Sequence, residues 1–179
     1  QHILALVKGM QAPSLTVARA ELSNDRPRQA LELLGEFLAG EELDHDGIEL
    51  FLTATEAYGK EEWGLGLALG LAQRDDRVHL LLARTLLSRS YPKEARELYE
   101  QFLERNVDDA EGLAGLIETF AILKNQPGLL NAVETALRAH PDDSALRSLC
   151  AAALAAVKSP QAKALELVEQ LVELSPLEL

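Results

Sequence analysis

Apolar residues recur along this chain at the spacing of amphipathic helices. One stripe occupies positions i, i+3, i+4 and i+7 of the segment that begins at residue 110: Leu113, Leu116, Ile117 and Phe120. The next segment carries a second apolar face: Leu130, Val133, Ala136 and Leu137. Asn125-Gln126-Pro127 separates the two segments, and Pro suits the first turn of a helix because its missing N–H needs no partner there. The pattern therefore predicts two helices joined by a short turn.

Prolines at the breaks between such segments indicate a repeat. Pro92, Pro127 and Pro160 are spaced by 35 and 33 residues, and Pro27 lies 65 residues before Pro92, about two repeats. A more degenerate unit fills that interval, with one stripe in its first helix: Ile48, Phe51, Leu52 and Thr55. The last helix is expected to bury another stripe: Leu167, Val168 and Leu171. A repeat of 33–35 residues with two helices per unit is typical of a helical solenoid.

The pattern resembles the tetratricopeptide repeat (TPR), and the resemblance covers essentially the whole chain. The best match to that family's repeat is Leu113, Leu116, Phe120, Ala136 and Pro141. The resemblance implies an all-α, right-handed superhelical solenoid of antiparallel helix pairs. Other solenoids of helical pairs remain an alternative.

We expect a single solenoid over residues 1–179, with about five units. Residues 1–11 would end a preceding unit, and the successive units would be 12–40, 44–74, 76–107, 108–141 and 142–176. The chain begins without Met, so we expect a fragment of a longer protein. Its Ala-, Leu- and Gly-rich, Lys-poor composition favours a bacterial source.

Two further features have structural interpretations. Gly64, Gly66 and Gly70 would weaken a helix, so we expect them to permit close approach of a neighbouring helix. The pairs Asp75-Asp76, Asp108-Asp109 and Asp142-Asp143 recur at the same phase of the repeat. They are therefore interpreted as helix N-caps and first-turn residues rather than catalytic carboxylates.

Charge and composition exclude several classes of function. The chain has 17 Lys and Arg against 29 Asp and Glu, a net charge of −12, which disfavours nucleic-acid binding because phosphate contacts need cations. Its apolar runs are far shorter than the roughly 20 residues that span a bilayer, so we expect no membrane insertion. The single thiol, Cys150, lies in an apolar run and is expected to be a buried small hydrophobe.

The sequence offers little chemistry for an enzyme. It has no glycine-rich phosphate loop and no Gly-x-Ser-x-Gly or His-Glu-x-x-His motif, and its four histidines lie in different units. The acidic run from Glu41 to Asp46 lacks the ligand spacing of a calcium-binding loop. We therefore expect no catalytic residues, no cofactor and no metal.

The resemblance instead implies that the first helices of successive units line a concave groove that binds a protein or peptide. The groove positions carried over from the family are Glu49, Leu50, Thr53, Glu56, Arg77, Leu80, Leu81, Arg84, Ser88, Glu111, Ala114, Glu118, Ile122, Ser148 and Ala152. Leu80 and Leu81 fit groove and core equally well. Arg77 and Arg84 are the only cations expected on these faces, so an apolar partner helix or extended segment fits better than a clamped terminal carboxylate.

The sequence thus predicts a non-catalytic interaction scaffold. Two alternatives stay open. The chain is a docking or regulatory domain of an enzyme or of a secretion or assembly machine, or it is an oligomerising spacer whose contact uses the apolar C-terminus: Leu171, Val172, Leu174, Leu177 and Leu179. Nothing in the sequence fixes the compartment.

Overall fold

The computed structural model describes residues 15–40, 43–73, 76–157 and 162–174, and all regular secondary structure in these ranges is helical. The expected end of a preceding unit, residues 1–11, lies outside them. The chain divides into two compact units, Gln1–Thr85 and Leu86–Leu179.

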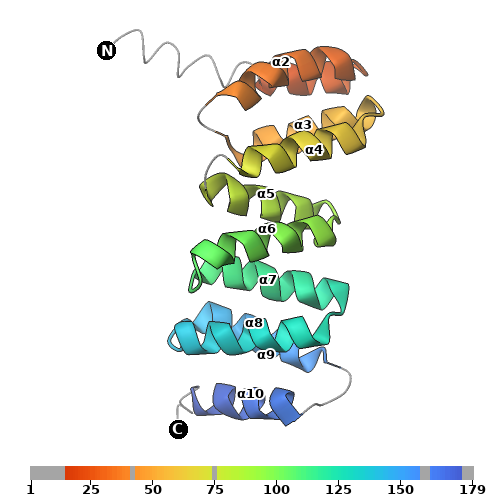
Figure 1. Ribbon diagram of the computed structural model, residues 1–179. Helices are drawn as coiled ribbons and strands as arrows, with labels where there is room; N and C mark the ends of the chain where they lie inside the picture. Colours follow the sequence, from red (N-terminus) through yellow and green to blue (C-terminus); the bar gives the residue numbers. More distant parts are fainter. Residues whose placement is uncertain (1–14, 41–42, 74–75, 158–161, 175–179) are drawn as a thin grey trace, which may run out of the picture. The chain divides into compact units, whose positions relative to one another are not determined.

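The first unit contains a helix over residues 15–23, followed by α2 (Pro27–Ala39), α3 (His45–Ala57), α4 (Glu61–Ala72) and most of α5 (Asp76–Ser88). Helix α3 packs against both α2 and α4 (Figure 1). Its expected stripe is buried: Ile48, Phe51, Leu52 and Thr55. The His45 Nδ1 and Thr85 Oγ1 atoms lie 2.9 Å apart, so a side-chain hydrogen bond also joins α3 to α5.

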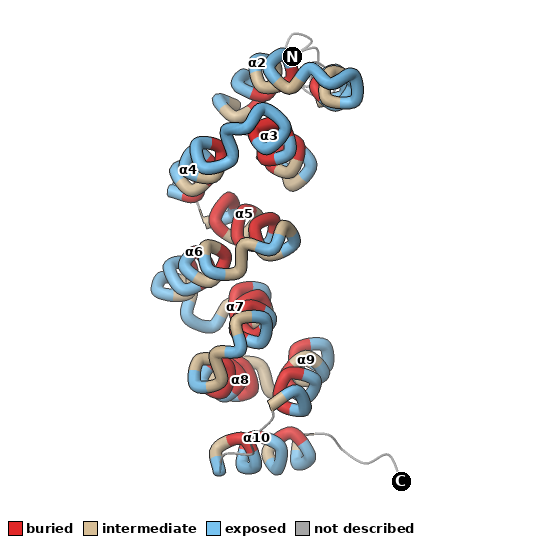
Figure 2. Tube along the Cα trace, turned by 90° about the vertical axis from the view of Figure 1, so that its right-hand side faces the viewer, coloured by how far each residue is buried: buried red, intermediate tan, exposed pale blue. Residues whose placement is uncertain are grey.

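The second unit contains α6 (Pro92–Arg105), α7 (Ala110–Leu123), α8 (Gln126–Ala139), α9 (Ser144–Ala155) and α10 (Ala162–Glu173). Helix α7 contacts α6, α8 and α9, and α10 contacts α8 and α9. Within this unit α7 and α9 lie on one side and α6 and α8 on the other (Figure 2). The two stripes predicted for α7 and α8 are buried. The described residues thus confirm a chain of antiparallel helix pairs.

Helix ends follow the local signals in the sequence. Pro27 and Pro92 begin α2 and α6, and Pro127 lies in the first turn of α8. The carboxylate of Asp109 accepts a hydrogen bond from the Gly112 N–H at 2.7 Å, and Asp143 caps α9 in the same way. These caps satisfy N–H groups that have no partner inside the helix, so the N-cap interpretation is confirmed for both residues.

The expectation for the glycines of α4 was correct at one position of three. A Cβ on Gly64 would overlap the Thr55 side chain of α3, whereas Cβ atoms on Gly66 and Gly70 would meet nothing within 4 Å. Gly66 and Gly70 are exposed, because they lie on the face of α4 that no described helix covers. Close approach therefore explains Gly64 alone.

The expectation for Val168 was wrong. Leu167 and Leu171 of α10 are buried as predicted, but Val168 is 44% exposed. Spacing alone placed all three residues on one stripe, and the structure shows that the described neighbours of α10 cover only part of that stripe.

Glycine replacements distinguish contact positions from open ones. A Cβ on Gly115 of α7 would overlap the Tyr99 ring of α6, so we expect Gly115→Ala to lower the free energy of unfolding by ~1–3 kcal/mol through overpacking. Gly66→Ala, at an open helical position, should raise it by up to about 1 kcal/mol. Urea titrations followed by circular dichroism measure both changes. A Gly115→Ala chain that is as stable as Gly66→Ala would show that α6 and α7 are not in close contact.

Candidate functional site

Six of the predicted groove residues lie on α7 and α9, the first helices of two successive pairs in the second unit. Glu111, Glu118 and Ile122 are exposed on α7 and Ala114 is half-buried there, while Ser148 and Ala152 are exposed on α9. Because α7 and α9 are in contact, these residues occupy neighbouring helices. We call this set the first-helix surface: Glu111, Ala114, Glu118, Ile122, Ser148 and Ala152.

Helical spacing explains why these residues share a face. Glu111, Ala114, Glu118 and Ile122 follow one another at intervals of three or four residues, opposite the buried stripe of α7. Ile122 is 57% exposed, so a large aliphatic side chain at the end of this row is accessible to a partner. The row is therefore acidic in its first turns and apolar at its end.

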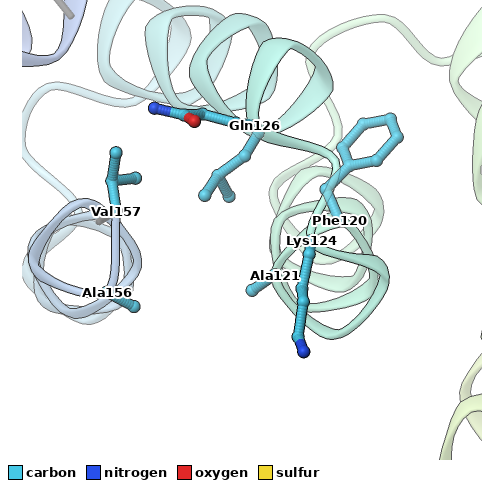
Figure 3. Close-up of a pocket in the computed structure, with 7 residues that line it drawn as sticks. Phe120, Ala121, Lys124, Gln126, Ala156 and Val157 are labelled. Atoms are coloured by element: carbon cyan, nitrogen blue, oxygen red, sulfur yellow. The ribbon is translucent and has the colours of Figure 1, made fainter. Parts of the chain in front are cut away.

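An apolar pocket lies at the end of this row (Figure 3). It has a volume of about 340 Å³ and is lined from three helix ends: Phe120, Ala121, Lys124, Gln126, Leu129, Ala156 and Val157. Ala121 and Ala156 point toward each other across the space, and Gln126 extends over it from α8 (Figure 3). No sequence motif marks this pocket, because its walls come from segments that only the packing of α7, α8 and α9 brings together.

Backbone conformation sets one edge of the pocket. Lys124 ends α7 with φ of 55°, in the left-handed region, so the chain reverses sharply and α8 begins at Gln126. Asn125 caps α8 through its side-chain oxygen, which accepts a hydrogen bond from the Gly128 N–H at 3.1 Å. The tight turn brings Lys124 and Gln126 to the same opening.

The predicted groove residues of α3 divide between surface and core. Thr53 and Glu56 are exposed and Glu49 is half-buried, but Leu50 is buried. The assignment of Leu50 to a partner-binding surface therefore needs correction, because its side chain already packs inside the first unit. Thr53 and Glu56 lie on the exposed face of α3, and Glu49 lies at its partly buried edge.

On α5 the predicted cations are accessible. Arg77 and Arg84 are exposed, whereas Leu80 and Leu81 are both half-buried, which matches neither a fully open groove nor a closed core. Ser88, which belongs to the second unit, is exposed.

The acidic segment near α3 has a structural role in its described part. Glu41 and Glu42 lie outside the described residues, and the Asp44 carboxylate accepts a hydrogen bond from the Gly47 N–H at 2.7 Å. Asp44 is therefore the N-cap of α3. Across the described ranges, no group of three or more His, Cys, Asp or Glu residues is arranged to hold a metal ion.

In the described part of the chain no helix has both the length and the apolar character that crossing a bilayer requires.

Cys150 is fully buried in α9. Burial raises the pKa of its thiol from 9.0 to about 11, because the thiolate loses its hydration. This agrees with the prediction of a buried small hydrophobe and differs from the lowered pKa of reactive thiols.

Comparisons with known proteins identify the fold. No family model matches the sequence, and no curated protein matches it. Among solved structures, YrrB, whose structure is described as that of a TPR protein with an unusual peptide-binding site, is 16% identical, with a TM-score of 0.54 over 98% of this chain and 93% of its own.

Two further solved structures are similar to this chain to the same degree. MamA residues 41 to the end, from Desulfovibrio magneticus RS-1, is 17% identical with a TM-score of 0.52, over 92% of this chain and 94% of its own. The TPR-like repeats of a putative kinesin light chain from Podosopora anserina are 17% identical with a TM-score of 0.52, over 91% and 93%. At this identity the likeness establishes the fold: the chain is an all-α solenoid of the TPR type, as its sequence predicts.

The burial of Cys150 has a measurable consequence for labelling, because it is the chain's one thiol. A rise in pKa from 9.0 to about 11 lowers the thiolate fraction at pH 8 about a hundredfold. We therefore expect a disulfide reagent to label the folded chain at least about a hundredfold more slowly than the urea-unfolded chain at that pH. Equal rates in the two states would contradict the burial of this side chain.

Proposed function

We propose that this chain is a non-catalytic protein–protein interaction scaffold that binds a partner peptide or helix on the first-helix surface. The observation that carries the proposal is the exposed Ile122, which lies in the same helical turn as the pocket residues Ala121 and Lys124. An exposed aliphatic side chain beside an apolar pocket offers an anchor for one large apolar residue of a partner.

The size of the pocket fits such an anchor. Ligand pockets in proteins span roughly 300–1000 Å³, and about 340 Å³ lies at the lower end, suited to one or two side chains rather than to a large cofactor. Phe120, Leu129 and Val157 contribute apolar walls. A buried apolar side chain surrounded by weaker contacts is the usual arrangement at the centre of a protein interface.

The negative charge of the first-helix surface favours a basic partner. Glu111 and Glu118 are exposed on the same row of α7 as Ile122, and the whole chain has a net charge of −12. A partner with Lys or Arg residues one or two helical turns from its apolar anchor would bind faster and in a defined direction. The preferred ligand is thus a short basic segment with one large apolar residue.

The fold neighbours support the same class of function. YrrB, a TPR protein, has a peptide-binding site, and helical repeats in general present extended surfaces to partners. A fold alone does not determine a function, so the proposal depends on Ile122 and its pocket rather than on the likeness.

The test uses peptides selected from a random display library against the full 179-residue chain. We expect the selected peptides to be basic and to carry a large apolar residue. Replacing Ile122 by Glu should raise their Kd about tenfold or more, the effect typical of a central interface residue. Fluorescence anisotropy with a labelled peptide measures this change.

Val107 provides the matched control. It is 59% exposed and lies between α6 and α7, away from the pocket lining, so Val107→Glu should change Kd by less than about twofold. Peptides that bind both variants equally well would place the binding site elsewhere, and failure to select any peptide would refute the proposal.

A further inference from the structure

Helix α10 carries an exposed apolar row that is buried at the corresponding positions of α8. The two helices align at an offset of 35 residues, which pairs Leu130 with Leu165, Val133 with Val168 and Leu137 with Val172. The three α8 residues are at most 2% exposed, whereas those of α10 are between 44% and 65% exposed. We call Leu165, Val168 and Val172 the outer stripe.

The neighbours of the two helices explain the difference. The inner row is buried on both helices: Leu129, Ala132 and Ala136 on α8, and Ala164, Leu167 and Leu171 on α10. Helix α8 contacts α7 and also the later helices α9 and α10, while α10 contacts α8 and α9. Helix α9 follows α8 and packs against it. Among the described residues, no later helix packs against α10 in the same way.

The contact between α6 and α7 in the same unit shows what kind of element covers the position that Val168 holds in α10. Helices α6 and α8 align at an offset of 34 residues, which pairs Phe102 with Ala136 and Tyr99 with Val133, the counterpart of Val168. The Tyr99 ring packs against α7 at Gly115, where no Cβ could fit. A residue at this position of a second helix is thus covered by the first helix of the next pair. The element that fits over Val168 is accordingly an α-helix.

The structure also has a cleft beside the outer stripe against which one face of such a helix would pack. A cleft of about 750 Å³ lies between α9 and α10, and its apolar walls include Ala151, Leu154 and Ala155 from α9 and Val168, Leu171 and Val172 from α10. A helix placed here would contact α9 and α10 together, as α9 contacts α7 and α8. We call the cleft and the outer stripe the end groove; it shares only its edge residue Ser148 with the first-helix surface.

The charges beside the end groove select the partner. Glu166, Glu169 and Glu173 directly follow the three outer-stripe residues in the sequence, and they form an exposed acidic row beside that stripe. Two cations lie nearby: Lys163 Nζ is 2.6 Å from Glu134 Oε2, and Arg147, which lines the cleft, donates from its guanidinium to the Pro141 and Leu174 carbonyl oxygens. Each has a partner within the chain, and the three carboxylates outnumber them. A second copy of this chain, with a net charge of −12, complements such a rim less well than a basic partner does.

We propose that the end groove binds an amphipathic α-helix of a partner protein, with a small aliphatic face and Lys or Arg along its edges. The face of α9, Leu146, Cys150, Ala153 and Leu154, is the template for that aliphatic face. This site goes beyond the proposed peptide-binding surface and uses different side chains.

The probe is a peptide that copies residues 144–157 with Cys150→Ala. A side-chain staple holds it helical, because a free helix of this length is marginal in water. In one version the exposed alanines 145, 151, 152 and 155 are replaced by Lys, and in the other by Glu. We expect the Lys peptide to bind the full chain and the Glu peptide to bind at least about tenfold more weakly at low salt, with the gap narrowing at high salt.

Val168→Asp should weaken the Lys peptide about tenfold or more, since it places a charge in the apolar contact. Val107→Asp, the same replacement at a valine that is 59% exposed and lies outside the groove, should leave Kd within about twofold. Melting temperatures of both variants check that the fold is intact.

Other results would overturn the proposal. Absence of binding, equal binding of the two peptides, or binding unaffected by Val168→Asp would each do so. Self-association of the chain that Val168→Asp abolishes, measured by analytical ultracentrifugation, would identify a second copy as the occupant instead. Loss of peptide binding through Ile122→Glu would place the probe on the first-helix surface, not in the end groove.

Discussion

The contact between the second helix of one pair and the first helix of the next is the constraint on which this architecture depends. At that junction the two backbones approach so closely that a large side chain on one helix requires a small one on the other. Phe37 of α2 packs on Gly47 of α3, and Phe102 of α6 packs on Gly112 of α7, ten residues further along the chain in both cases. At the next junction the order of sizes is reversed: Ala136 of α8 and Leu146 of α9 hold these positions, and both are buried. Complementary volume, rather than a fixed residue type, is what repeats.

Much of this fold could be predicted because its determinants are local. Proline at a first turn and Asp at an N-cap act within a few residues. The starts of three helices, marked by Pro92, Asp109 and Asp143, could therefore be predicted. The predictions that failed depend on neighbours instead. Gly66 and Val168 have the residue types and spacing of contact positions, yet the described helices leave both exposed. No periodicity within one helix can reveal whether another helix covers it.

The candidate site shows the same limit more strongly. The row on α7 was predicted from the resemblance to the TPR family, whose groove positions correspond to Glu111, Glu118 and Ile122, and helical spacing places these three on one face. Leu50 occupies an apparently similar position on α3 but is buried. The pocket beside Ile122 needed the left-handed turn at Lys124 and the approach of Ala156, which are properties of the assembled unit. The face of a helix on which a residue lies can thus be predicted, whereas its burial and the cavities between helices depend on how the helices pack.

If neighbouring helices share one core, protection from solvent should depend on how many neighbours a helix has. Native-state amide hydrogen exchange on the second unit tests this directly. We expect the central amides of α7 and α8 to exchange about tenfold or more slowly than those of α10, whose outer stripe the described helices leave exposed. Protection of α10 equal to that of α8 would contradict the account, because it would mean that the outer stripe is covered in solution or that the helices are stabilised independently of their neighbours.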